Sequence, residues 1–272
     1  MIKNRIENDL YLLVGDTYHS NSTAFVSEDG VLLVDALASR ADAEALKDFV
    51  EQELKKEVRF IICTHYFSDH MAALKLFPRA TIIAHQDYLD TFNAEKYRSE
   101  EEAGHFVEPD ILISDGIKIR WGRYTLDVFH NPGHTTSTLG IDVSEADLLM
   151  VGDTLVGNIV YLYYSTPELH QQALERLQRR ARGHLISSHG PVRSPAALDN
   201  ALFYLKRLGE STRVARSSTM GEQSLLKAPL ESFLPTSVAA TPFEKIFHER
   251  NLQTVIERKF FAPAEARPQV TG

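Results

Sequence analysis

Hydrophobic positions in the first third of the chain follow two different periods. Short runs rich in β-branched and aromatic residues, separated by glycine and acidic turn residues, predict an antiparallel meander of strands at residues 11–14, 23–26 and 31–35. Between residues 41 and 55 the apolar positions instead fall three and four apart, with acids and lysines on the other side. This spacing predicts a helix that buries one face.

Three further elements are predicted before the middle of the chain. The continuous apolar run at residues 58–64 predicts a core strand, residues 71–77 predict a helix that ends before Pro78, and residues 81–84 predict another strand. With the helix at 41–55 they give the order β-α-β-α-β, which places this part of the chain in the α/β class.

The second half has a similar mixture of strands and helices, and the two halves resemble each other. The predicted strands are 111–113, 117–121, 124–129, 138–143, 148–151 and 185–188. Residues 166–182 predict an amphipathic helix, and residues 195–208 predict another, opened by a serine and a proline.

Beyond residue 210 the pattern changes. The periodicity is weaker from residue 214 to about 234, and a helical pattern returns at residues 242–260. No low-complexity linker divides the chain. We therefore expect a domain at residues 1–210 and a helical C-terminal extension, residues 211–272, packed on the same domain.

The amino-acid composition indicates the cellular compartment in which the protein is expected. A length of 272 residues is enough to bury a large core without cross-links, and the single cysteine, Cys63, excludes an internal disulfide. Charges at Lys3, Arg5 and Glu7 interrupt the N-terminal apolar positions, so neither a signal peptide nor a membrane span is predicted. These features favour a cytoplasmic protein.

The balance of charged residues indicates which classes of binding partner to expect. Lysine and arginine number 29 against 37 acidic residues, a formal net charge of −8. Nucleic acids are held by clustered cations, and the densest basic stretch, residues 176–182, is interpreted as the solvated face of a helix. We therefore expect no nucleic-acid partner and no membrane partner, but a small-molecule substrate.

Histidines and aspartates that follow predicted strands are the most informative feature of the sequence. The block from His65 to His70 comes directly after the strand at 58–64 and contains Asp69. Three more candidates also end β-like runs and have glycine or proline beside them: His134, Asp153 and His189. Such neighbours allow sharp turns that aim a side chain back over the edge of a sheet.

Imidazole and carboxylate are the usual nitrogen and oxygen ligands of Zn²⁺ and related ions, and a catalytic ion needs several of them. For any one of these residues the plainer interpretation is an ordinary polar residue at a strand end. Six of them in similar positions favour a metal centre.

This arrangement resembles the metallo-β-lactamase superfamily. That family has a His-x-His-x-Asp-His block, then Pro-Gly-His-Thr, then Gly-Asp-Thr-Leu, then a histidine after a strand. The matching residues occur here in the same order over about residues 10–210: His65, Asp69, His70, His134, Asp153 and His189. The resemblance implies a four-layer αββα sandwich with the site at the shared edge of two sheets.

One position departs from the family pattern, because Phe67 replaces the second histidine of the block. In the family, one metal uses both block histidines and the equivalent of His134, the second uses the equivalents of Asp69, His70 and His189, and Asp153 bridges. The resemblance thus implies a weakened first site and an intact second site. We expect Zn²⁺, as one or two ions, with Fe or Mn also compatible with the donors.

The resemblance also implies a mechanism, in which the metal lowers the pKa of a water so that it attacks a carbonyl or phosphoryl centre. Asp69 is expected to orient that water as well as to bind metal. We therefore predict a metal-dependent hydrolase of a small ester, lactone, thioester or phosphoester.

Two rival functions remain open. An iron-binding redox or oxygen-handling protein is suggested by Phe67, because two histidines and a carboxylate also suit non-haem iron. A catalytically silent binding protein would keep the fold with one metal site lost.

Residues outside the predicted ligands are less clearly defined. Asp35 resembles a family position that hydrogen-bonds a ligand histidine, although it is equally well interpreted as a turn residue. Tyr161 and Tyr163 follow the Asp153 loop and are candidates for a substrate wall or for packing. The apolar stripe at Phe243, Ile246, Phe247 and Leu252 is expected either to cap the active site or to form a homodimer interface.

Overall fold

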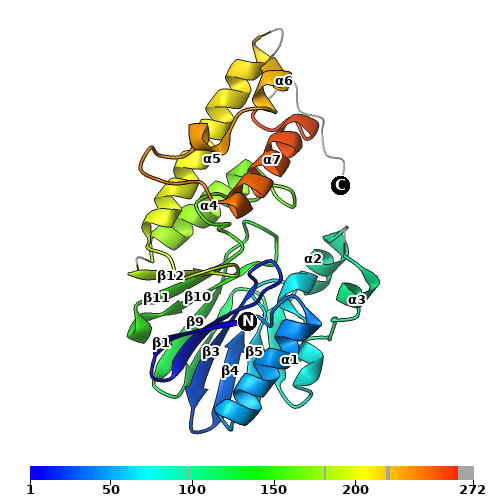
Figure 1. Ribbon diagram of the computed structural model, residues 1–272, viewed down its shortest axis with the longest axis vertical. Helices are drawn as coiled ribbons and strands as arrows, with labels where there is room; N and C mark the ends of the chain where they lie inside the picture. Colours follow the sequence, from blue (N-terminus) through cyan, green and yellow to red (C-terminus); the bar gives the residue numbers. More distant parts are fainter. Residues whose placement is uncertain (97, 181, 219–220, 263–272) are drawn as a thin grey trace.

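Two β-sheets lie face to face in the computed structural model of the chain, with helices on both outer sides (Figure 1). The structure describes residues 1–96, 98–180, 182–218 and 221–262. One sheet has seven strands in the order β1-β2-β3-β4-β5-β6-β7, and the other has five in the order β12-β11-β10-β9-β8. The predicted αββα sandwich is therefore confirmed.

The seven-stranded sheet starts as the predicted antiparallel meander and continues in parallel. The antiparallel strands are β1 (Ile2–Glu7), β2 (Leu10–Val14), β3 (Asn21–Ser27) and β4 (Gly30–Val34). The parallel strands are β5 (Val58–Ile62), β6 (Thr81–His85) and β7 (Ile111–Ile113). Strand β1 was not predicted, because most of its side chains are exposed at the sheet edge and show no buried face.

The prediction of a helix at residues 71–77 is wrong. Two short 3₁₀ turns, η2 (Ser68–His70) and η3 (Leu74–Leu76), occupy this region instead. The amides of Ala72 and Ala73 donate to the carbonyls of Leu37 and Ala36, at 3.0 and 2.9 Å. These bonds to the segment after β4 replace the ladder that an α-helix would form, so tertiary pairing overrides the apolar periodicity.

The five-stranded sheet is antiparallel except at its last pair. Its strands are β8 (Gly116–Trp121), β9 (Tyr124–His130), β10 (Leu139–Val143), β11 (Leu148–Gly152) and β12 (His184–Ser187). A 3₁₀ turn, η4 (Ser144–Ala146), links β10 to β11, and β12 pairs with β11 in parallel. As a result β9, β11 and β12 all end at the same edge of this sheet.

Helices cover the outer faces and build one end of the molecule (Figure 1). Helix α1 (Arg40–Asp48), followed by a π-helical turn at Phe49–Glu53, packs on the first sheet, and α2 (Tyr88–Ala94) and α3 (Glu100–Ala103) lie near its edge. The remaining helices are α4 (Pro167–Gln178), α5 (Ala196–Arg216), α6 (Gly221–Leu225), the 3₁₀ turn η5 (Leu230–Phe233) and α7 (Pro242–Glu257). Within the described ranges, none of these helices combines the length and the apolar character needed to cross a bilayer.

The helical extension joins the sandwich without a break. Helix α5 runs through residue 210, and residues from both sides of that position share one buried cluster with the second sheet. The division at residue 210 stays a prediction. Ala181, in the predicted helix 166–182, and residues 263–272 of the extension lie outside the described residues.

Three apolar clusters hold the layers together. Side chains from both sheets, including Phe25, Trp121 and Tyr124, fill the space between them, and the Phe25 and Tyr124 rings meet edge to face at 5.3 Å. Each outer face has its own cluster beneath its helices. Fully burying one large apolar side chain contributes about 1.5–3 kcal/mol, so these clusters fix the loops at the shared sheet edge.

Candidate metal centre

Loops that follow four strand ends bring the six predicted ligands together. His65 follows β5, and Asp69 and His70 lie in η2 a few residues later. His134, Asp153 and His189 follow β9, β11 and β12. Strands of both sheets therefore supply side chains to one edge of the sandwich.

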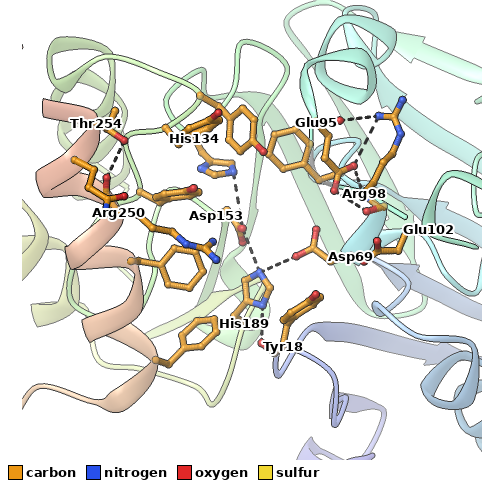
Figure 2. Close-up of a pocket in the computed structure, with 18 of the residues that line it drawn as sticks. Tyr18, Asp69, Glu95, Arg98, Glu102, His134, Asp153, His189, Arg250 and Thr254 are labelled. Atoms are coloured by element: carbon orange, nitrogen blue, oxygen red, sulfur yellow. Dashed lines mark hydrogen bonds and ion pairs between the residues drawn. The ribbon is translucent and has the colours of Figure 1, made fainter. Parts of the chain in front are cut away.

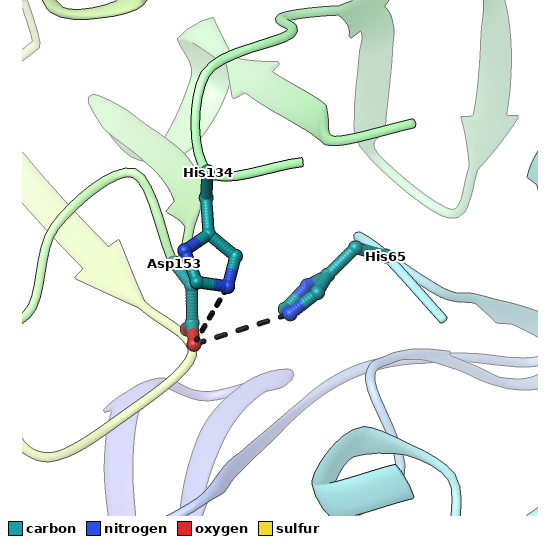
Figure 3. A group of neighbouring side chains, drawn as sticks. All are labelled: His65, His134 and Asp153. Carbon is teal, nitrogen blue, oxygen red and sulfur yellow. Dashed lines mark ion pairs between the residues drawn. The ribbon is translucent and has the colours of Figure 1, made fainter. Parts of the chain in front are cut away.

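The six residues form two groups of candidate metal donors. The first donor set is His65, His134 and Asp153, and the second donor set is Asp69, His70 and His189. In each set the ligand atoms lie within 4.8 Å of one another. Figure 3 shows the His65 and His134 rings both directed toward the Asp153 carboxylate.

Asp153 lies between the two sets. Its Oδ2 is 3.9 Å from the Nε2 atoms of both His65 and His134. The same oxygen is 3.8 Å from His70 Nε2 and 3.2 Å from His189 Nε2. One carboxylate oxygen thus faces four imidazoles, which belong to both donor sets.

Asp69 belongs to the second set alone. Its Oδ1 is 3.2 Å from His70 Nε2 and its Oδ2 is 3.4 Å from His189 Nε2. The Asp69 side chain keeps 23% of its surface exposed, whereas the histidines around it are buried. It is therefore the donor that water in the cavity reaches most easily.

Several nitrogen and oxygen atoms of the two donor sets are buried without a hydrogen-bond partner. His65 Nε2, both ring nitrogens of His70 and of His134, and Asp153 Oδ1 have none within the described parts of the chain. An unpaired buried polar atom costs about 1–3 kcal/mol, so a cluster of them calls for a further partner. The candidate donors are nitrogen and oxygen atoms that lie close together within each set. Donors of this kind fit a divalent ion such as zinc.

Hydrogen bonds of Nδ1 orient two of the rings so that their Nε2 atoms face Asp153. His189 Nδ1 lies 2.9 Å from the carbonyl oxygen of Tyr18 and donates to it. His65 Nδ1 lies 3.1 Å from Thr64 Oγ1, which donates in turn to Asp35 Oδ2 at 2.8 Å. His65 Nδ1 therefore carries the proton and its Nε2 faces Asp153 with the lone pair, whereas His189 Nε2 lies 3.2 Å from Asp153 Oδ2, within hydrogen-bond distance.

Asp35 supports both sides of the centre without a direct hydrogen bond to a ligand histidine. It accepts from the Thr64 amide at 2.7 Å and from Ser188 Oγ at 2.8 Å, and its Oδ2 is 3.9 Å from His70 Nδ1. Its backbone is left-handed, with φ of 58°, a conformation that is strained for a non-glycine residue. Burial raises the pKa of Asp35, against the lowering effect of His70 and of these hydrogen bonds.

Electrostatics differ between the two sets of histidines. Burial lowers the pKa of His65 and of His134, and the nearby His70 adds to this effect. Burial also acts on His70 and His189, but Asp69 and Asp153 outweigh it, raising the pKa of His70 to about 10 and that of His189 above its usual value. His189 and His70 in turn hold the pKa of Asp153 well below its usual range despite its burial.

Two glycines allow the turns that aim Asp153 and His189. Gly152 has a φ of 56° at the end of β11, and Gly190 has a φ of 78° directly after His189. A β-carbon at Gly152 would also meet Thr64 and Thr138 at 3.4 Å. The glycines beside these ligands, which the sequence analysis noted, thus occupy left-handed backbone positions.

Phe67 stands among the ligands of the first donor set. Its ring centroid lies 5.1 Å from that of His65 and 5.4 Å from that of His134. It also packs on Tyr164 at 4.5 Å and is only 5% exposed. The ring therefore occupies space beside the first set without offering a donor atom.

A cavity of about 520 Å³ opens over the centre (Figure 2). Asp69, His134, Asp153 and His189 line its floor. Tyr161 and Tyr163 line it as well, with their rings stacked at 6.1 Å. The cavity lies within the usual size range of small-molecule sites.

The cavity also contains residues that the sequence analysis did not identify. Glu95 accepts hydrogen bonds from the amide and hydroxyl of Ser68 at 3.0 and 2.6 Å, which fixes the start of the turn that carries Asp69. Helix α7 contributes a face to the wall, made of Phe243, Phe247, Arg250, Gln253, Thr254 and Glu257. The helical spacing of Phe243, Phe247 and Arg250 was the available signal, because it places them on one face.

Of the apolar C-terminal stripe, only part lines the cavity. Phe243 and Phe247 do so, whereas Ile246 is 50% exposed and Leu252 is buried in the cluster under α5. The stripe therefore divides between two faces of α7.

Comparisons with known proteins agree with this geometry. The family model described as "Metallo-beta-lactamase superfamily" matches residues 15–201. A metallo-beta-lactamase type 2 from Bacillus cereus is 24% identical over 210 residues, which cover 74% of this chain and 78% of that protein. A hydroxyacylglutathione hydrolase from Pseudomonas fluorescens is 27% identical over 143 residues, 52% of this chain and 50% of the relative.

Solved structures show the same fold. The stereoselective inverting sec-alkylsulfatase from Pseudomonas sp. superposes with a TM-score of 0.67 at 14% identity. The match covers 94% of this chain and 50% of that chain, so this protein spans about half the length of that structure. At this level of identity the likeness concerns the fold.

Proposed function

The chain belongs to the metallo-beta-lactamase superfamily of metal-dependent hydrolases, and from its site we propose that it cleaves a small ester, lactone, thioester or phosphoester. The observation that carries this proposal is the convergence of six nitrogen and oxygen donors on one cavity floor, with buried imidazole atoms that lack partners. The names of the relatives support hydrolysis, including a thioester class for the hydroxyacylglutathione hydrolase.

We assign the metal ligands as the two donor sets. His65, His134 and Asp153 would hold one ion, and Asp69, His70 and His189, with Asp153, would hold the other. Zinc suits these donors best, as one or two ions, and iron or manganese also accept them. A bound dication lowers the pKa of a water toward neutrality and polarises the bond under attack.

The chain's own residues position the reactants. Asp69, the most exposed donor, accepts a hydrogen bond from the attacking water and orients it. Tyr161 and Tyr163 form a wall beside it that excludes water from the substrate. Asp35, through Thr64, holds the His65 ring in its tautomer.

Metal content and turnover, measured together, test the proposal. Protein purified without chelators is analysed for zinc, iron and manganese per chain, and then assayed on an ester, a lactone, a thioester and a phosphodiester with and without chelator. We expect bound zinc and a chelator-sensitive rate on at least one substrate. His85→Ala, which removes a buried histidine outside both donor sets, should retain the metal.

Two results would favour the rival functions. Bound iron with a visible-range absorption change on reduction would indicate a redox or oxygen-handling protein. Bound metal with no chelator-sensitive rate on any substrate would indicate a catalytically silent binding protein. We also propose a cytoplasmic location, from the single cysteine, Cys63, which is buried; the homodimer stays a prediction.

A further inference from the structure

We propose that helix α7 forms a subsite for an anionic group of the substrate, with Arg250 as the residue that recognises it. The inference rests on the proposed function, because it names the class of substrate: a small ester or thioester with an apolar body and a carboxylate or similar anion at its far end. Figure 2 shows the Arg250 side chain extending from α7 toward the donors Asp153 and His189.

Arg250 has no carboxylate partner among the described residues. Its guanidinium lies 5.5 Å from the centroid of the Phe247 ring, and no salt bridge joins it to any acid that the structure describes. Glu257 lines the same wall but stands seven residues further along α7, about 10 Å along the helix axis. A cation with an aromatic neighbour and an open cavity before it is ready to bind an anion.

The other arginine of the cavity is already engaged. Arg98 Nη1 lies 4.0 Å from Glu95 Oε2 and donates to the carbonyl oxygens of Phe92 and Glu95. Its guanidinium also stacks 3.8 Å from the Phe92 ring centroid. Arg98 is thus held by its own segment, and its charge is paired.

The two side walls of the cavity therefore differ in charge. Glu95 and Glu102 stand with Arg98 on the wall near α2 and α3, and Arg250 stands on the α7 wall, with the metal donors between them (Figure 2). An anionic substrate would be repelled from the first wall and attracted to the Arg250 end of the second, away from Glu257. The charge distribution consequently sets the direction in which such a substrate lies across the centre.

An apolar path connects the donors to Arg250. The Phe243 ring lies 5.7 Å from that of His189, and Phe243 and Phe247 meet at 4.9 Å. Phe247 also contacts Tyr161 at 4.9 Å. A substrate whose reacting bond lies over the donors would place its apolar body on these rings and its anionic end at Arg250.

The α7 wall is fixed by its opposite face. Asn251 accepts a hydrogen bond from the Leu162 amide at 2.8 Å and donates to the Val160 carbonyl at 2.7 Å. Glu244 accepts from the amide and side chain of Asn158 at 2.6 and 2.9 Å. Because these bonds tie α7 to the loop that carries Tyr161, Arg250 projects from a preorganised support.

Two matched esters test the subsite. Zinc-loaded protein is assayed on phenyl 4-methylbenzoate and phenyl 4-carboxybenzoate, and the ratio of the two kcat/KM values is compared between variants, which cancels differences in metal loading. We expect Arg250→Met to lower the preference for the carboxylate ester about tenfold, and Arg250→Lys to restore part of it. Arg258→Met is the control, because Arg258 caps the C-terminus of the same helix, lies over Tyr163 and does not line the cavity.

A binding measurement separates this inference from the proposed function. Calorimetry compares 4-phenylbutyrate with its neutral amide on the same zinc-loaded proteins, and we expect Arg250→Met to weaken only the carboxylate, about tenfold. Esters left uncleaved by the wild type would count against the proposed function, while binding would still decide the subsite. Equal ester ratios or equal carboxylate affinities in Arg250→Met and Arg258→Met would overturn the inference, since the carboxylate would then be held elsewhere, for example by the metal.

Discussion

The two donor sets lie on the same cavity floor but differ in the negative charge that faces them. The first set has two imidazoles and the carboxylate of Asp153, with the Phe67 ring packed beside it. The second set has its own carboxylate, Asp69, within 3.2 Å of one imidazole and 3.4 Å of the other, and Asp153 reaches it as well. The same difference appears in the histidine pKa values, which are lowered in the first set and raised in the second.

From this difference we infer two metal positions of unequal strength. Attraction between a dication and its donors grows with the number of anionic groups near it. We therefore expect the second donor set to bind its ion more tightly and the first set to fill only at higher metal concentration.

The largest effect on metal content and turnover is expected from a change at Asp153, which lies between the two donor sets. Asp153→Ala removes the carboxylate oxygen that faces all four imidazoles, so both positions should lose affinity, and kcat/KM should fall at least about a thousandfold. Metal content per chain and chelator-sensitive turnover measure this. Asp142→Ala is the control, because Asp142 is buried in ion pairs with Arg180 and Arg182 away from the centre. Full metal content in Asp153→Ala would contradict the assignment.

Single histidine changes should separate the two sets. His189→Ala should remove the tightly bound ion and nearly all turnover, because it takes one of three donors from the second set. His134→Ala should leave about one ion per chain and a larger residual rate. Equal metal losses in the two variants, measured by elemental analysis after dialysis, would show that the sets are not of unequal strength.

A change at Asp35 should weaken both sets together. Asp35 holds Thr64, next to His65, and Ser188, next to His189, so Asp35→Asn disturbs the support of a ligand in each set. We expect about a 10- to 100-fold loss of metal affinity at both positions, with the fold retained. Competition with a chromogenic chelator gives the two affinities, and circular dichroism checks the fold. A loss confined to one position would mean that Asp35 supports only that set.

The smallest effect on metal binding is expected from adding a donor to the first set. Phe67→His replaces a ring that lies 5.1 Å from His65 with a possible donor, and should raise the affinity of the first position about tenfold, or about 1.4 kcal/mol. The metal content should rise toward two ions per chain, whereas Phe67→Leu should not change it. An unchanged content in Phe67→His would mean that this side chain does not reach the ion.

The convergence of these candidate ligands could be predicted from the sequence because each of them carries a local signal. His65, His134, Asp153 and His189 all follow apolar strand patterns, and the last three have glycine or proline neighbours. The αββα fold followed from the order of these motifs and their family resemblance. The left-handed backbone at Gly152 and Gly190 is the physical reason for that local signal.

The parts that could not be predicted depend on tertiary contacts. The helical pattern at residues 71–77 gave way to backbone pairing with Ala36 and Leu37, which lie far from it in sequence. Likewise, Glu95 supports Ser68 across 27 residues of chain, and nothing near Glu95 in sequence indicates this. The cavity wall on α7 depends on where the C-terminal extension packs. The local periodicity of the sequence does not indicate that position.

Helix α7 separates two tasks between its faces. Its inner face, with His248, Asn251, Leu252 and Val255, is buried, while Phe243, Phe247 and Arg250 lie toward the cavity. The exposed cavity-side residues Arg250, Gln253 and Glu257 can therefore be exchanged with little cost to folding, whereas Phe243 and Phe247 also pack against the buried cluster. Under selection for new substrates, this helix offers positions where variation would be tolerated first, and a library restricted to them is a direct route to altered selectivity.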